Sequence, residues 1–130
     1  MNNSITKFHH IYNPINHKTF GSMTILTSIQ YNDSHPTLPP FSILYSIAFC
    51  SPNDHFNKKI GRNIAIHRVN NNESQFTGIT NPKTPKHNDI ILSILCDLIA
   101  YNNYPDWAKK LILNNIITLS FNIINPKYKI

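Results

Sequence analysis

The sequence predicts an α+β fold of two layers, in which a mostly antiparallel sheet of three to five strands has two or three helices packed on one face. Three segments alternate large apolar residues with small or polar ones, which is typical of half-buried strands. Two other segments carry apolar residues at helical spacing. The 130 residues contain no internal repeat and no long linker, so we expect a single domain over 1–130.

The strands are predicted from alternation and from the turn residues that bound each segment. Their apolar faces are expected to meet the helices, whereas their polar faces are expected to be solvated or to meet a partner. The proline-rich segment 32–40 is predicted to be a loop. The predicted strands are 5–12, 22–31, 41–50, 73–80 and 117–123.

A helix is predicted to begin directly after the strand at 41–50 and to end near 70–72. Ser51 can cap it, Pro52 suits its first position, and Asp54 stands where a capping box places an acid. The same kind of pattern predicts two later helices at about 87–102 and 105–113.

The first predicted helix is amphipathic. Phe56, Ile60 and Ile64 fall on one face at helical spacing and are expected to point inward. Basic residues follow on the other side, where they are expected to meet solvent or a partner: Lys58, Lys59 and Arg62.

Basic residues outnumber acidic residues, but charged residues of both signs together are few. Twelve Lys and Arg face six Asp and Glu, which gives a formal net charge of +6, and only 14% of the residues are charged. Such a surplus favours attraction to nucleic acid or to an acidic protein surface. Since the other lysines are scattered, the basic group on the first helix is the most organised charge in the chain.

The candidate binding surface is therefore this helix and its flanks. Lysine and arginine side chains there can contact phosphates, and neighbouring amide and imidazole groups can add neutral hydrogen bonds. The alternative is an ordinary solvated helix face. The candidate residues for nucleic-acid or partner binding are His55, Asn57, Lys58, Lys59, Arg62, Asn63 and Arg68.

Catalytic and metal chemistry are less favoured by the pattern. The spacing of Cys50, Cys96 and the seven histidines is not that of a zinc finger or ribbon, so no metal and no cofactor are expected. Cys50 with a histidine could in principle form a thiol nucleophile and its base, as in a small nuclease or hydrolase. A thiol at the end of an apolar strand is more often a packing residue, so we expect a binding protein rather than an enzyme.

Residues 51–65 resemble a pattern found in small, poorly characterised phage and mobile-element proteins: S-P-x-D-x-F, a basic pair, then G-R-x-I-A. In size and composition the chain is similar in kind to small phage proteins that disarm host defences, including anti-CRISPR proteins. The resemblance implies inhibition or regulation of a host nucleoprotein or defence complex. The alternative is an accessory DNA- or RNA-binding protein of replication or transcription.

No apolar run is long enough to span a bilayer, and no secretion signal opens the chain. We therefore expect a protein of the host cytoplasm that does not act at a membrane.

Overall fold

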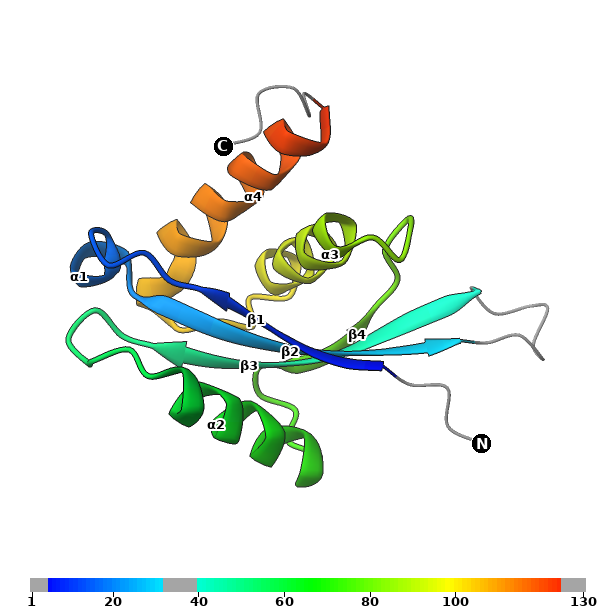
Figure 1. Cartoon of the computed structure of the whole chain (residues 1–130), viewed down its shortest axis with the longest axis horizontal. Coiled ribbons are helices and arrows are strands. Elements are labelled where there is room, and N and C mark those ends of the chain that lie inside the picture. Colours follow the sequence, from blue (N-terminus) through cyan, green and yellow to red (C-terminus); the bar gives the residue numbers. More distant parts are fainter. Residues whose placement is uncertain (1–4, 32–39, 125–130) are drawn as a thin grey trace.

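The computed structural model describes residues 5–31 and 40–124 and confirms the α+β class. Its four strands form one antiparallel sheet in the order β1-β2-β3-β4 (Figure 1), so that β1 and β4 are its edges. Most of the predicted loop 32–40 lies outside the described residues. The elements are β1 (Ile5–Ile11), α1 (His17–Phe20), β2 (Ser22–Tyr31), β3 (Phe41–Cys50), α2 (Lys58–Asn70), β4 (Thr77–Thr80), α3 (His87–Ala100), the 3-10 turn η1 (Asp106–Ala108) and α4 (Lys109–Ile124).

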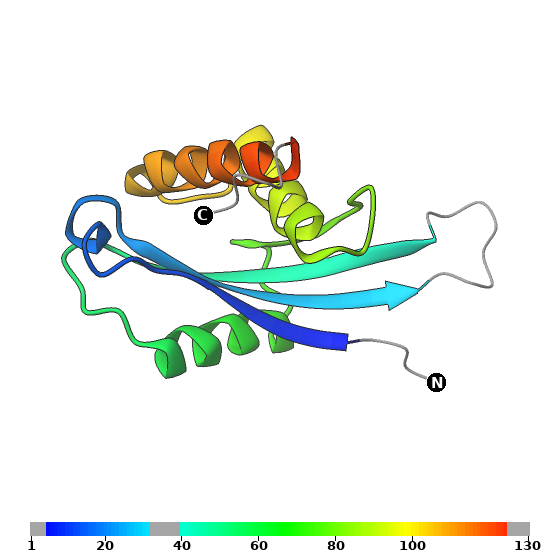
Figure 2. The same cartoon turned by 45° about the horizontal axis from the view of Figure 1, so that its top comes forward.

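The helices lie on both faces of the sheet, not on one face as predicted. Helices α3 and α4 cover one face and α2 covers the other, which gives three layers (Figure 2). The main core lies on the α3 and α4 side, because the apolar residues of β2 and β3 point there. Its fully buried side chains include Met23, Ile25, Ile43, Ile47, Ile91, Ile94, Leu95, Leu98 and Ile112.

The polar face of the sheet is neither solvated nor open, because α2 packs on it. Thr24 and Ser46 are buried there, and the Ser46 hydroxyl donates a hydrogen bond of 2.8 Å to the carbonyl of Ala65 in α2. A methyl group on Gly61 would overlap the Thr24 hydroxyl and lie 3.0 Å from Thr24 Cβ. Small residues on both sides therefore let α2 approach the sheet closely.

This close packing reverses the predicted orientation of α2. Ala65 is fully buried, whereas Ile60 is 57% and Ile64 is 37% exposed. The hydrophobic pattern failed as a guide because the surface that α2 covers presents serine and threonine hydroxyls. A small residue fits such a surface better than a branched apolar side chain.

Helix α2 also begins later than predicted, with Asn57 as its N-cap. The Asn57 side-chain oxygen accepts a hydrogen bond of 3.0 Å from the Ile60 amide. Ser51 and Asp54 instead close a turn, in which the Asp54 amide bonds to the Ser51 carbonyl and the Ser51 hydroxyl bonds to the Asp54 carboxylate. The Asp54 carbonyl accepts a hydrogen bond from the ring of His17 instead of from a backbone amide of a helix.

The predicted strand at 117–123 is wrong, since these residues belong to α4. Apolar residues occur there at both periods, and the helical one decides the structure. Ile112 is fully buried, while Ile116 and Leu119 pack against the core at intervals of four and three residues. Within the two described stretches, no helix combines the length and apolar character that crossing a bilayer requires.

Candidate functional site

The segment before α2 is held firmly against the end of β1. The His17 ring lies 2.6 Å from the Asp54 carbonyl through Nε2 and 2.6 Å from the Ser22 hydroxyl through Nδ1. Phe56 stacks on Tyr12, with ring centroids 4.3 Å apart and an angle of 9° between the rings. These contacts fix where α2 begins relative to the edge strand β1.

The basic patch, which we define as Lys58, Lys59 and Arg62, begins at that fixed point. Thr24 lies beside Gly61 of α2 and also bonds to Nδ1 of His10 in β1, at 2.8 Å. Helix α2 and β1 are therefore joined through one buried threonine. Burial lowers the pKa of His10, and the positive charges of Lys58 and Arg62 lower it further.

The charges of the basic patch are not neutralised. In the part of the chain that the structure describes, none of its three side chains lies within 4.0 Å of a carboxylate. Lys58 and Lys59 occupy the first turn of α2, where no acidic residue is present. Cations at the positive end of a helix cost a few tenths of a kcal/mol to about 1 kcal/mol each. An anionic partner would remove that cost, whereas helix stability alone gives no reason for this placement.

The other predicted residues near the patch have mixed roles. Asn57 caps α2, so its side-chain oxygen is occupied. His55 lines a cavity of about 350 Å³ beneath Ile60 and Ile64, and Asn63 lines a separate cavity along α2. His55 and Asn63 are exposed, but no contact joins them to His10.

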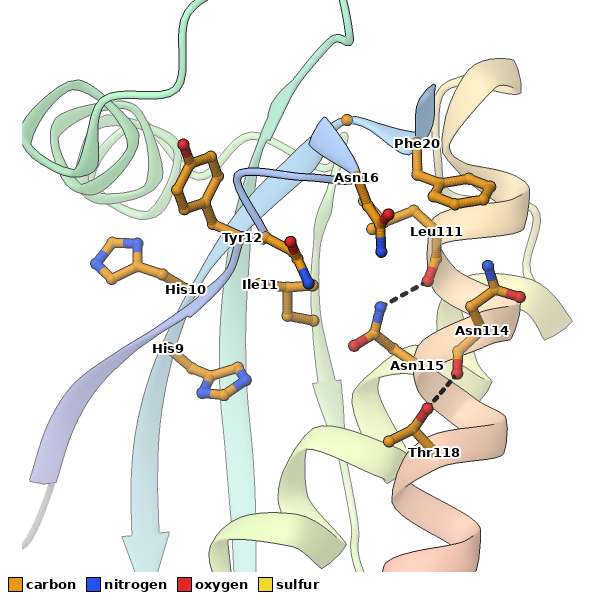
Figure 3. A pocket seen from close by; sticks show the side chains of 12 residues that line it. His9, His10, Ile11, Tyr12, Asn16, Phe20, Leu111, Asn114, Asn115 and Thr118 are labelled. Atoms are coloured by element: carbon orange, nitrogen blue, oxygen red, sulfur yellow. Dashed lines mark hydrogen bonds between the residues drawn. The ribbon is translucent and has the colours of Figure 1, made fainter. Parts of the chain in front are cut away.

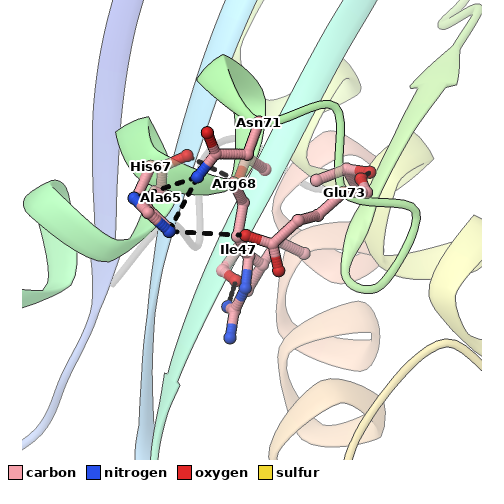
Figure 4. Close-up of polar contacts among 8 residues, drawn as sticks. Ile47, Ala65, His67, Arg68, Asn71 and Glu73 are labelled. Carbon is pink, nitrogen blue, oxygen red and sulfur yellow. Dashed lines mark hydrogen bonds and ion pairs between the residues drawn. The ribbon is translucent and has the colours of Figure 1, made fainter.

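Arg68 serves the fold. Its guanidinium donates to the carbonyl of Ile47 in β3 (Figure 4) and lies 5.0 Å from the centre of the Phe76 ring. Burial lowers the pKa of Arg68, and Glu73 opposes that shift. The ring of His67, the residue before Arg68, meets the side chains of Asn71 and Glu73.

The thiol of Cys50 does not have the surroundings of an activated nucleophile. Burial raises its pKa, and the negative charge of Asp54 raises it further, so the thiolate is disfavoured at neutral pH. The Sγ atom lies near the carbonyls of Ser51, Asp54 and His55 rather than near an imidazole. No group of three or more potential metal ligands occurs among residues 5–31 and 40–124.

A cavity of about 390 Å³ lies on the other side of β1, between the end of that strand and α4 (Figure 3). We call it the amide pocket, because Asn16 and Asn115 project toward it from opposite sides. The lining also includes His9, His10, Ile11, Leu111 and Thr118. None of its lining residues is Lys, Arg, Asp or Glu.

The sequence reasoning missed the amide pocket. The one signal was the pair at 114–115, which interrupts an otherwise apolar stretch. That stretch was assigned partly to a strand, so the pair had no predicted face. His17 and Thr24 gave no signal at all, because a single histidine or threonine is common in any segment.

In comparisons with known proteins, the chain matches no family model, no curated protein and no solved structure.

Proposed function

We propose that this protein binds nucleic acid by contacting phosphates with the basic patch. The observation that carries the proposal is the grouping of Lys58, Lys59 and Arg62 in the first turns of α2, with no acid in the first turn and no carboxylate within 4.0 Å of these side chains in the described residues. Since the contacts of His17 with Asp54 and of Tyr12 with Phe56 hold the start of α2 near the end of β1, this positive charge lies toward one edge of the sheet. Lysine and arginine on such a surface are the usual phosphate contacts.

The bulk charge of the chain supports the same proposal. A net charge of +6 attracts a polyanion at a distance, and the patch supplies a local set of contacts. The contacts that hold the start of α2 near the end of β1 favour binding further, since a positioned segment loses less motion when a partner docks.

The partner in the cell is proposed to be a nucleoprotein complex of the host, such as a defence complex, and the outcome to be its inhibition or regulation. A small basic protein that covers phosphates of a guide or target strand would block access to that strand. The alternative is an accessory DNA- or RNA-binding protein, which uses the same patch on free nucleic acid.

A direct test is fluorescence anisotropy with labelled 20-nucleotide DNA and RNA, single- and double-stranded. The test variant is Lys58→Ala/Lys59→Ala/Arg62→Ala. The matched control is Lys18→Ala/Lys83→Ala/Lys109→Ala, which removes three exposed cations from other elements and changes the net charge equally.

We expect the patch variant to lose at least tenfold in affinity and the control to lose much less. Circular dichroism must show that both variants remain folded. Equal losses of affinity in the two variants would show that net charge alone, and not the patch, determines binding. A wild-type protein that binds none of the four probes would refute direct nucleic-acid binding. A pull-down from host extract would then test for a protein partner.

A further inference from the structure

The amide pocket has the dimensions of a small-ligand site and an uncharged lining. Its volume of about 390 Å³ falls within the usual range for ligand pockets, roughly 300–1,000 Å³. Ile11 and Leu111 supply apolar walls, and the polar groups include asparagine amides, a threonine hydroxyl and the imidazole of His9. Burial together with His87 and His10 lowers the pKa of His9 to about 4, so its ring is neutral at physiological pH. A ligand in this pocket would be neutral where it touches the protein.

The hydrogen-bonding groups of the pocket are positioned for a ligand. The Asn115 amide nitrogen donates to the Leu111 carbonyl at 2.8 Å, which fixes the side chain and leaves its oxygen toward the cavity (Figure 3). Asn16 stands at the N-cap of the short helix α1, but its side chain makes no capping hydrogen bond. Its amide faces Asn115 across the cavity. The pocket therefore presents hydrogen-bonding amides from two sides.

The pocket and the basic patch are neighbours across β1. His10 borders the pocket, but its ring lies on the α2 side of β1. There Nδ1 lies 2.8 Å from the hydroxyl of Thr24, the residue that contacts Gly61 of α2. In Figure 3 the residues of α4 lie on the pocket side of β1, and the His10 ring points to the opposite side. A chain of phosphates that crosses the end of β1 can thus contact the patch while an attached group enters the pocket.

We infer that the amide pocket receives one unpaired nucleobase of a strand whose phosphates lie on the basic patch. This inference rests on the proposed function and adds to it a preference for single strands. A planar base fits between apolar walls, and its edge carries both donors and acceptors for asparagine amides. In a duplex those edges are already paired, so the duplex offers the patch its phosphates only.

The test compares three probes of equal length: a single strand, its duplex, and a single strand with abasic sites, which keeps the phosphates and lacks bases. The pocket variant is Asn16→Ala/Asn115→Ala. The control is Asn70→Ala, an exposed asparagine of α2 outside the pocket. Thermal melts establish that each variant is folded.

The wild type and the control should bind the base-bearing single strand about tenfold more tightly than the abasic strand, the magnitude of one or two well-placed hydrogen bonds. The pocket variant should lose that difference and keep the salt dependence of binding. A nucleoside monophosphate should displace the strand at lower concentration than ribose phosphate, because the base carries the recognition.

Equal affinity of the wild type for the base-bearing and abasic strands would overturn the inference and leave phosphate binding by the patch intact. Failure of every strand to bind would remove the proposed function as well, so the two failures are distinguishable.

Discussion

Arg68 differs from the other basic residues of α2, because its side chain contacts the fold rather than solvent. By sequence it belonged with Lys58, Lys59 and Arg62 as a candidate contact. In the structure its guanidinium bonds to the Ile47 carbonyl and lies over the Phe76 ring. An arginine side chain that was fully exposed to solvent would make neither of these contacts.

Replacing Arg68 should therefore affect stability and not binding. Arg68→Met keeps much of the side-chain volume but loses the hydrogen bond, which should reduce the free energy of unfolding by about 2 kcal/mol. Urea denaturation measures this loss, and anisotropy on the folded variant should give an unchanged affinity. An equally stable variant that no longer binds would contradict this assignment and return Arg68 to the contact surface.

His9 makes stability depend on pH. Its folded pKa of about 4 lies below the ordinary value of 6.5, chiefly because of burial and then because of His87 and His10. Between these two values the unfolded chain binds more protons than the folded one. The free energy of unfolding therefore falls as the pH drops from 6.5 toward 4.

Urea midpoints at several pH values test this sign. His9→Gln should flatten the dependence between pH 6.5 and 4, whereas the control His55→Gln, at an exposed position, should leave it as in the wild type. The same slope in His9→Gln and in the wild type would show that other groups cause the loss.

At the scale of elements, the packing of α2 depends on the absence of a side chain at Gly61. Gly61→Ala should raise helix propensity by about 1 kcal/mol. The added methyl group would overlap Thr24, however, and overpacking of this kind costs about 1–3 kcal/mol. We expect a lower free energy of unfolding in urea. In a Thr24→Ala background the penalty should shrink, and a Gly61→Ala variant more stable than the wild type would exclude the close packing.

Helix α4 provides a second test, because helical and strand periods place its apolar residues differently. Ile112→Ala should cost about 2–5 kcal/mol, since this side chain is fully buried. Ile117→Ala should change stability by less than about 0.5 kcal/mol, since its side chain is 68% exposed. Thermal or urea unfolding distinguishes the two. A large loss on replacing Ile117 would favour the strand pattern instead.

The two central strands and the start of α3 were predicted accurately from the sequence. The strands at 22–31 and 41–50 have the predicted bounds, and α3 begins as predicted at His87. The start of α2 was missed because a turn and a helix N-terminus use the same residues, here Ser51 and Asp54. Only the long-range contact of His17 with the Asp54 carbonyl selects the turn.

The candidate site was predictable only in part. A run of basic residues is visible in the sequence, so Lys58, Lys59 and Arg62 could be chosen without a structure. Their position beside the sheet depends on the packing of α2 against β2 and β3, which no local pattern encodes. The amide pocket brings together Asn16 and Asn115, which are 99 positions apart in the sequence, and it depends on the placement of α4 beside β1.

At the scale of the whole molecule, the three layers leave β1 as an open edge with different surfaces on its two sides. Helix α2 brings positive charge to one side, and α4 closes an uncharged cavity on the other. This arrangement would let one edge of the sheet contact both the phosphates and a base of a single strand. The contact between the phosphates and the basic patch is the central claim.

The most direct test of that claim is the salt dependence of binding to a single-stranded 20-mer. If the three patch residues each neutralise a phosphate, the logarithm of the association constant should fall with the logarithm of salt concentration with a slope of about −2 from these contacts. The patch variant should lose that part of the slope, and the matched triple-lysine control should keep it. An unchanged slope in the folded patch variant would show that Lys58, Lys59 and Arg62 do not contact phosphates.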